Sequence, residues 1–278
     1  MPAESLALVQ DAPSLAGKNI YFSEAFKEAS QFDRSDAGIS RYAGLLRLMG
    51  ANLFTLEWRK GIPATADLVV IPGPTSDLAP DVAARLWAYI QRGGRVLLLV
   101  DAVDERGNPS RALPATKGLF ELTWNDLGLH ALDDVVVVEG AVRTVDVTET
   151  DRDGNVTAQY SIDSPELSLG FETGLVSESH PITEGLDMGA SPASGEGDSS
   201  DAALSQFVFW GARSLEIDAS LQNQVVTPLI FVDQPNLYGE TDYATYVRTN
   251  GAVEYNIGSD SARGPLILAA SLENPTVG

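Results

Sequence analysis

Cysteine is absent from the 278 residues, and this absence removes several kinds of chemistry at once. Without cysteine the chain has no disulfide, no thiolate metal ligand and no cysteine nucleophile. Histidine is scarce as well, because His130 and His180 are the two in the chain. They stand too far apart for a zinc motif, which needs closely spaced ligands. We therefore predict no metal site and no cofactor, and expect both histidines to be structural.

Positive charge is the second thing in short supply. The chain has 18 Lys and Arg residues against 39 Asp and Glu residues, and its formal net charge is -21. Such a surface repels phosphate backbones and anionic lipid headgroups, so we exclude nucleic acid as a partner. We interpret the acidic residues as a well-solvated surface rather than as a cation-binding face.

Long apolar runs are also missing. No stretch approaches the roughly 20 residues that a membrane-spanning helix needs. The N-terminal residues 1–19 lack a basic segment followed by a long apolar one, so they are not a signal peptide. We expect the chain as given to be soluble.

The first hundred residues show a regular order of apolar patterns. Helical spacing at residues 38–50 is closed by a glycine, and a second apolar stripe runs from Pro80 to the double glycine at 93–94. Apolar runs without alternation, typical of strands buried in a parallel sheet, flank these helices. The predicted strands are 19–22, 52–58, 67–73 and 95–101. The order predicts an open α/β sheet with mainly parallel strands, in which 95–101 is the most clearly buried strand.

One more strand is predicted at 133–140, and the pattern of the sequence changes after residue 140. Alternation over residues 141–162, with Asp153-Gly154 at its centre, predicts a β-hairpin. Asp151, Asp153 and Asn155 carry the oxygen ligands of a calcium loop, but the twelve-residue pattern is incomplete, so we favour a turn. Residues 189–203 are low in complexity and predict a mobile loop. We expect a lead-in segment at 1–17 and a single α/β domain at 18–278, with a β-rich insertion at about 135–185.

The junction "DLVVIPGPTSDLAPDV" (residues 67–82) is the main candidate site. In a parallel α/β sheet, ligands bind at the carboxyl ends of the strands, where this turn and Asp101 both fall. The four candidate ligand-binding residues are Gly73, Pro74, Thr75 and Asp101. Pro72 and Pro74 offer no backbone N–H, which disfavours an anion site, and no glycine-flanked nucleophile is present. We favour a structural turn over a catalytic role for Thr75 or Ser76, and predict no catalytic residue.

The block "ADLVVIPGPTSDLAPDVAARLWAYIQRGGRVLLLVD" resembles a known family. It is similar to the extracytoplasmic auxiliary proteins of ABC-type transport systems, the GldG-type gliding-motility family. In that family an apolar strand ends in Gly-Pro, a helix ends in a Tyr and a double glycine, and a second strand ends in Asp. Further blocks follow in the family's order, so that the resemblance covers roughly Lys18 to Ser271: "GLFELTWNDLGL", "VVVV", "SHPITEGL", "FVFWGARSLEI", "VVTPLIFVD" and "GPLILAAS".

The resemblance implies a fold like the class I glutamine-amidotransferase domain, a flavodoxin-like sheet with added strands. Related domains occur in an intraflagellar-transport protein and have been proposed to bind carbohydrate. The family is usually anchored by transmembrane helices beside an ABC permease. Both anchors are absent from this sequence, so we expect either a trimmed extracytoplasmic domain, anchored in its full-length form, or a soluble relative. Amidotransferase activity is excluded, because it needs a cysteine.

Our first hypothesis is a non-enzymatic binding or scaffolding domain of an ABC-type export or gliding-type system. Its partners would be the permease and ATPase complex or another membrane partner, with a carbohydrate as a second ligand class. One alternative is a hydrolase that uses Ser or Thr with His130 or His180, which requires a histidine within hydrogen-bond reach of a hydroxyl group. The other alternative is a purely structural subunit.

Overall fold

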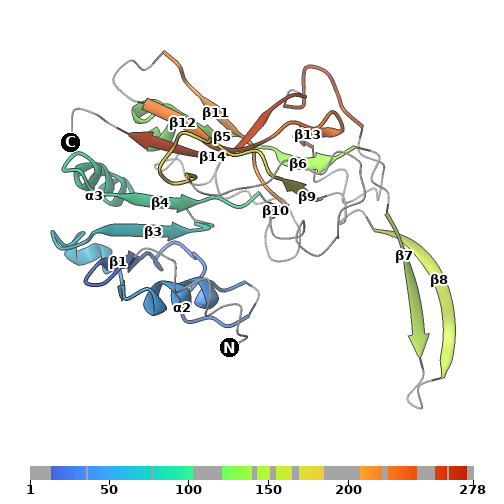
Figure 1. Cartoon of the computed structure of the whole chain (residues 1–278), viewed down its shortest axis with the longest axis horizontal. Helices are drawn as coiled ribbons and strands as arrows, with labels where there is room; N and C mark the ends of the chain where they lie inside the picture. The colour runs from blue at the N-terminus through green and yellow to red at the C-terminus, as the bar shows by residue number, and fades with distance from the viewer. Residues whose placement is uncertain are drawn as a thin grey trace.

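The structure is a computed structural model of the whole chain (Figure 1). It describes residues 14–35, 37–76, 78–102, 121–139, 143–150, 155–164, 169–184, 207–220, 225–242, 254–261 and 263–273. The predicted lead-in over 1–17 falls largely outside the described residues. The predicted mobile loop at 189–203 and the hairpin turn at Asp153-Gly154 fall wholly outside them.

The N-terminal part is a four-stranded parallel sheet. Its strands are β1 (Asn19–Phe22), β2 (Asn52–Thr55), β3 (Leu68–Pro72) and β4 (Val96–Leu99), in the order β2-β1-β3-β4. The helices are α2 (Ser40–Leu48), between β1 and β2, and α3 (Pro80–Ile90), between β3 and β4. A short helical turn, η1 (Trp58–Lys60), leads from β2 back toward β3. The sequence patterns of this part therefore predicted the order of its elements correctly.

Strand β3 lies between β1 and β4, and a helix covers each of its two faces. Val69 and Ile71 pack with Leu86 of α3, whereas Val70 packs on the other face with Leu46 of α2. Successive side chains of a strand point to opposite faces, so an unbroken apolar run suits a strand covered on both sides. Pro80 begins α3 at a position where a missing backbone N–H costs nothing.

Strand β4 corrects one of our expectations. The sequence predicted that 95–101 would be the most clearly buried strand, but among the described strands β4 pairs only with β3 and lies at the edge of the parallel sheet. Its residues are partly buried, and Leu99 is exposed. Apolar content alone does not distinguish a central strand from an edge strand that other segments partly cover.

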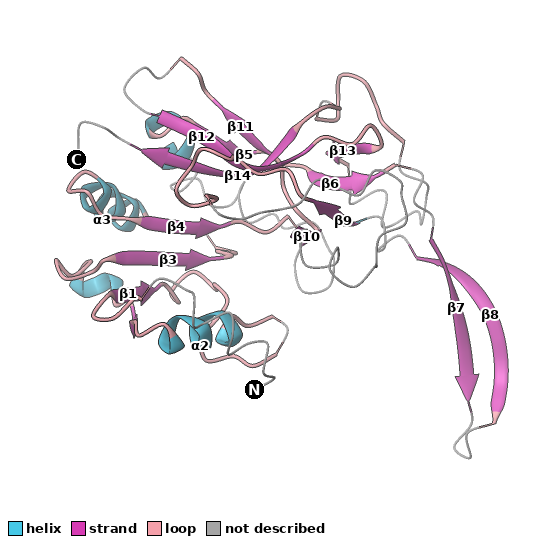
Figure 2. Ribbon diagram, viewed as in Figure 1, coloured by secondary structure: helices cyan, strands magenta, loops and turns pink. Residues whose placement is uncertain are grey.

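The rest of the described chain is built from small antiparallel sheets (Figure 2). One sheet has the order β12-β14-β11-β5, and the pairs β13-β6, β10-β9 and β7-β8 complete the set. The elements are η2 (Glu121–Asp126, a π-type turn), β5 (Leu129–Ala131), β6 (Val135–Val138), β7 (Arg143–Thr150), β8 (Val156–Ser164), β9 (Gly170–Thr173), β10 (Phe207–Trp210), β11 (Leu215–Ile217), β12 (Val225–Val232), β13 (Leu237–Glu240) and β14 (Leu266–Glu273).

The fold-class prediction is therefore wrong. The protein is mostly β-strand in several small, mainly antiparallel sheets with one small parallel sheet, and it is not a flavodoxin-like or amidotransferase-like α/β fold. The physical reason lies in the connections. Parallel neighbours need a crossover of about a dozen residues, usually a helix. Only five residues separate β7 from β8, too few for such a crossover, and these two strands pair antiparallel.

The predicted hairpin over 141–162 is confirmed as the antiparallel pair β7 and β8. This pair extends away from the other sheets as a long two-stranded arm at the right of Figure 1. Val156 and Tyr160, on β8, are exposed. Among the described residues, no helix is long and apolar enough to cross a membrane.

Candidate functional site

The structure brings Gly73 and Asp101 together at the carboxyl ends of β3 and β4. Gly73 has a positive φ of 65°. A Cβ atom placed on Gly73 would lie 2.6 Å from Oδ2 of Asp101, so the carboxylate rests close to the glycine backbone. Both the left-handed backbone and this close approach favour glycine. We call Gly73, Pro74, Thr75 and Asp101 the β3 corner.

The backbone donors of the β3 corner are already used within the protein. The Gly73 N–H donates to the Leu99 carbonyl at 2.9 Å. The Thr75 and Ser76 N–H groups both donate to the carbonyl of Phe26, at 3.0 and 3.1 Å. These bonds leave Gly73, Thr75 and Ser76 no backbone N–H with which to hold a phosphate or an oxyanion.

The loop that follows β1 is hydrogen-bonded to the corner. Ala29 N–H donates to the carbonyl of Pro72 at 2.9 Å, and the Thr75 hydroxyl donates to the Lys27 carbonyl at 3.3 Å. Pro74 is buried, whereas Thr75 and Asp101 are exposed. Thus two of the four predicted residues, Thr75 and Asp101, are exposed to solvent.

Asp101 lies in the field of a buried arginine. Protein atoms crowd the carboxyl group although the residue as a whole is exposed, and this partial desolvation raises the pKa of Asp101. The guanidinium of Arg213 acts in the opposite direction but is the smaller effect. Arg213 itself is buried, and its Nη1 lies 3.6 Å from Oδ1 of Asp133.

Asp134 is the best-connected carboxylate in this region. The N–H and the hydroxyl of Ser214 donate to its two oxygens at 3.0 and 2.6 Å, and the Ser261 hydroxyl donates to Oδ2 at 2.5 Å. A Cβ on Gly239 would lie 2.0 Å from the same Oδ2. Asp134 therefore ties together the segments before β6, before β11 and before β14, with a glycine on β13 making room for it.

Sequence reasoning missed this network. Asp133 and Asp134 are adjacent in the sequence, yet Asp133 is exposed and Asp134 is buried. No local pattern distinguishes the two aspartates, and their partners lie about 80 residues or more away along the chain. The network holds segments together and places no free donor or acceptor at the β3 corner.

His180 is buried and lies within hydrogen-bond reach of a hydroxyl group. Its Nε2 is 2.9 Å from the Ser271 Oγ, and its Nδ1 accepts the N–H of Ile182 at 3.2 Å. Because Nδ1 is an acceptor, the ring proton of the neutral imidazole sits on Nε2. Nε2 then donates to the serine, so this geometry gives Ser271 no basic nitrogen of the kind that a catalytic triad requires.

The ring of His130 packs at a tilt of 48° against Trp124, with centroids 5.0 Å apart, and its Nδ1 lies 3.8 Å from a carboxylate oxygen of Glu216. Burial is the main cause that lowers the pKa of His130, and Glu216 opposes it. The described residues contain no group of three His, Asp or Glu side chains arranged to hold a metal ion.

Comparison with known proteins gives one informative match. The family described as "ABC-type uncharacterized transport system" matches residues 42–193, more than half of the chain. The chain therefore belongs to this family of auxiliary components of ABC-type transport systems. The matched residues include the β3 corner and both strands of the β7–β8 arm.

Solved structures give weak likenesses. The structure titled "mmIFT52 N-terminal domain" has a TM-score of 0.43 and 14% identity, and the match covers 86% of this chain and all of that one. A beta-galactosidase from Bifidobacterium adolescentis has a TM-score of 0.24 and 17% identity, over 74% of this chain and 94% of that one. Both scores are too low to carry an argument. No curated protein sequence matches the chain.

Proposed function

We propose that this chain is a non-enzymatic binding or scaffolding domain that works outside the cytoplasm in its ABC-type transport system. Within the family, the GldG-like gliding-motility proteins are the subgroup that we favour. The single observation that carries the proposal is the family match over residues 42–193. It associates the chain with a membrane transport system and includes the two surface features to which a function can be assigned.

The β3 corner supports binding rather than catalysis. The backbone N–H groups of Gly73, Thr75 and Ser76 are used within the protein, so they are not available to stabilise an oxyanion. Thr75 and Asp101 are exposed residues that supply one hydroxyl and one partly desolvated carboxylate, groups that recognise donors on a partner protein. We therefore favour a protein over a glycan as the ligand of this corner.

The β7–β8 arm supports a scaffolding role. A two-stranded hairpin by itself is marginally stable in water, because it has no third strand or helix on which to pack. The exposed Val156 and Tyr160 give β8 apolar surface that a partner can cover. An arm of this kind is suited to reach a second protein while the sheets hold its base.

The partner is tested by affinity capture. The chain, immobilised by a tag, is incubated with detergent-solubilised membranes of its source organism, and bound proteins are identified by mass spectrometry. We expect the permease or ATPase subunits of an ABC system to be enriched, and the Thr75→Ala/Asp101→Asn double variant to lose most of this enrichment. A control, Thr65→Ala/Asp233→Asn, makes the same chemical changes at exposed positions elsewhere. Equal capture by the two double variants would show that the β3 corner is not the contact.

The location of the domain is tested separately. Because these 278 residues contain no cysteine, a single introduced cysteine is the one site within them that a maleimide can label. The full protein carrying Thr65→Cys, at an exposed position away from the β3 corner, is expressed in intact cells and treated with a membrane-impermeant maleimide. We expect labelling without permeabilisation. Labelling that occurs only after the cells are lysed would place the domain in the cytoplasm and contradict this part of the proposal.

A further inference from the structure

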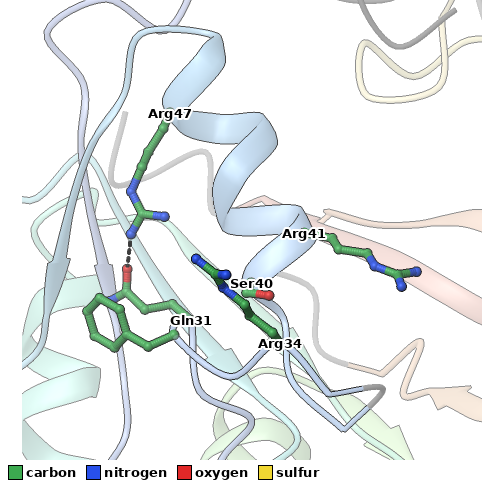
Figure 3. A pocket seen from close by; sticks show the side chains of 6 residues that line it. Gln31, Arg34, Ser40, Arg41 and Arg47 are labelled. Carbon is green, nitrogen blue, oxygen red and sulfur yellow. Dashed lines mark hydrogen bonds between the residues drawn. The ribbon is translucent and has the colours of Figure 1, made fainter. Parts of the chain in front are cut away.

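Three arginines gather in one short stretch of a chain that has little positive charge. Arg34, Arg41 and Arg47 fall within fourteen residues, although the whole chain has only 18 Lys and Arg residues and a net charge of -21. The three come from the loop after β1 and from α2. They line a pocket of about 370 Å³ together with Gln31, Phe32 and Ser40. Figure 3 shows this pocket, which we call the arginine pocket.

These arginines are not neutralised by the described part of the protein. None of the three forms an ion pair with a described carboxylate. The nearest acidic residue in the sequence, Asp33, uses its carboxylate to accept the N–H of Ser35 at 2.8 Å. Positive charges held near one another repel, and a bound anion removes this repulsion.

A buried side chain orients one of the arginines. Gln31 is only 1% exposed, and its Oε1 accepts a hydrogen bond from Nη2 of Arg47 at 3.1 Å. On its other side, the Nε2 of Gln31 makes a longer contact, 3.4 Å, with the hydroxyl of Thr55 at the end of β2. The buried amide of Gln31 therefore orients the guanidinium of Arg47 through Nη2, and the other nitrogens of the guanidinium remain available to a ligand.

The start of α2 adds to the positive potential of the pocket. Ser40 and Arg41 form its first turn and line the pocket, and no side chain caps this helix end. The first N–H groups of a helix carry a partial positive charge and favour anions. Figure 3 shows the guanidinium groups of Arg34 and Arg47 on the side of Gln31, whereas the side chain of Arg41 extends away from them.

We propose that the arginine pocket binds a small anion that presents two or more oxygens, a carboxylate or a phosphate group. Guanidinium groups match both anions with paired hydrogen bonds. The volume is at the lower end of the range for small-molecule sites. A large polyanion is disfavoured, because the acidic remainder of the protein repels it. Phe32, 65% exposed at the pocket, offers an apolar ring to the uncharged part of the ligand.

The test measures binding of two simple probes to the 278-residue chain by isothermal titration calorimetry. The probes are inorganic phosphate and citrate, titrated at constant ionic strength with chloride as the balancing anion. We expect saturable binding of at least one probe at one site per chain, and the tighter probe identifies the anion class. A Kd of about 1 mM is the weakest affinity that would support the proposal. Absence of a binding isotherm for both probes at concentrations up to about tenfold above this Kd would overturn it.

Three variants separate a built pocket from diffuse attraction. Arg34→Gln and Arg47→Gln should each weaken binding at least about tenfold, because each removes a charge-assisted hydrogen bond to the anion. Arg41→Gln removes the same charge from α2, the helix that also carries Arg47. Because the side chain of Arg41 extends away from the other two arginines, this variant should weaken binding less than about threefold. Equal losses in all three variants would mean that net charge alone attracts the anion, and the pocket would be refuted. Circular dichroism confirms that each variant is folded.

Discussion

Replacing Asp134 by alanine should destabilise the protein more than any change at its neighbour Asp133. Asp134 is 2% exposed and accepts hydrogen bonds from the N–H of Ser214 and from the hydroxyls of Ser214 and Ser261. It also provides part of the negative field around the buried Arg213. The substitution removes the acceptor of all three donors and a counter-charge of the arginine at the same time.

The magnitude follows from what remains after the carboxylate is gone. A buried donor left without an acceptor costs about 1–3 kcal/mol, and removing one partner from a buried charge pair costs about 3–5 kcal/mol. The two serine hydroxyls can rotate to other acceptors, and Asp133 and Asp101 still attract Arg213. We therefore expect Asp134→Ala to lower the free energy of unfolding by about 3–4 kcal/mol.

The assay is urea unfolding followed by circular dichroism, with Asp133→Ala as the matched control. Both variants remove one negative charge from the same loop, so the relief of charge repulsion across the acidic surface is equal in the two. The Asp133 side chain is 74% exposed and lies 3.6 Å from Nη1 of Arg213. Although Arg213 is buried, the carboxylate of Asp133 faces water, which screens this pair, so the control should lose no more than about 1 kcal/mol.

Two results would refute this reasoning. One is a loss below about 1 kcal/mol in Asp134→Ala, which would mean that the three donors are satisfied elsewhere at little cost. The other is an equal loss in the two variants, which would mean that the field around Arg213, and not the hydrogen bonds, carries the effect. A change in the slope of the free energy of unfolding against urea concentration would instead indicate that the compactness of the unfolded or native state has changed.

Two further predictions concern single residues. Gly73→Ala should cost about 1–2 kcal/mol for the left-handed backbone, and more because the new Cβ would meet Oδ2 of Asp101 at 2.6 Å. The part due to this contact should disappear in an Asp101→Ala background, and strict additivity of the two substitutions would contradict the close approach. Burial, aided by Asp260, raises the pKa of Glu240 above its ordinary 4.5. The ionised form is thus disfavoured in the folded state, and stability from this site falls as pH rises through the raised pKa. Urea unfolding of Glu240→Gln should show a variant that gains stability relative to the parent between pH 4 and 7.5; a constant difference would remove Glu240 as the cause.

The local elements of the first hundred residues were predictable because each depends on nearby residues. Local patterns predicted three of these elements: the spacing of apolar residues before Gly50 predicted α2, the proline at position 80 predicted the start of α3, and the unbroken apolar run predicted β3. The same is true of the alternating residues that form the β7–β8 arm. Periodicity and the conformational limits of glycine and proline decide these features without reference to the rest of the chain.

The candidate sites were predictable only in part. The positions of Gly73 and Asp101 at neighbouring strand ends followed from the parallel order of β3 and β4. That Pro74 is buried and that the loop after β1 accepts the hydrogen bonds of Thr75 and Ser76 did not follow from any local signal. The arginine pocket had a weak signal, three arginines in fourteen residues of an acidic chain, but the buried Gln31 that orients Arg47 had none.

The sequence by itself determined the acidic surface, the absence of cysteine chemistry, the order of the N-terminal elements and the motifs that resemble the family. Only the tertiary structure decided that the later strands pair antiparallel in small sheets, that β4 lies at an edge, and that Asp134 rather than Asp133 is buried. The reason is physical. Periodicity depends on contacts within a few residues, whereas strand pairing and the burial of a carboxylate depend on partners such as Ser214 and Ser261, 80 and 127 residues away.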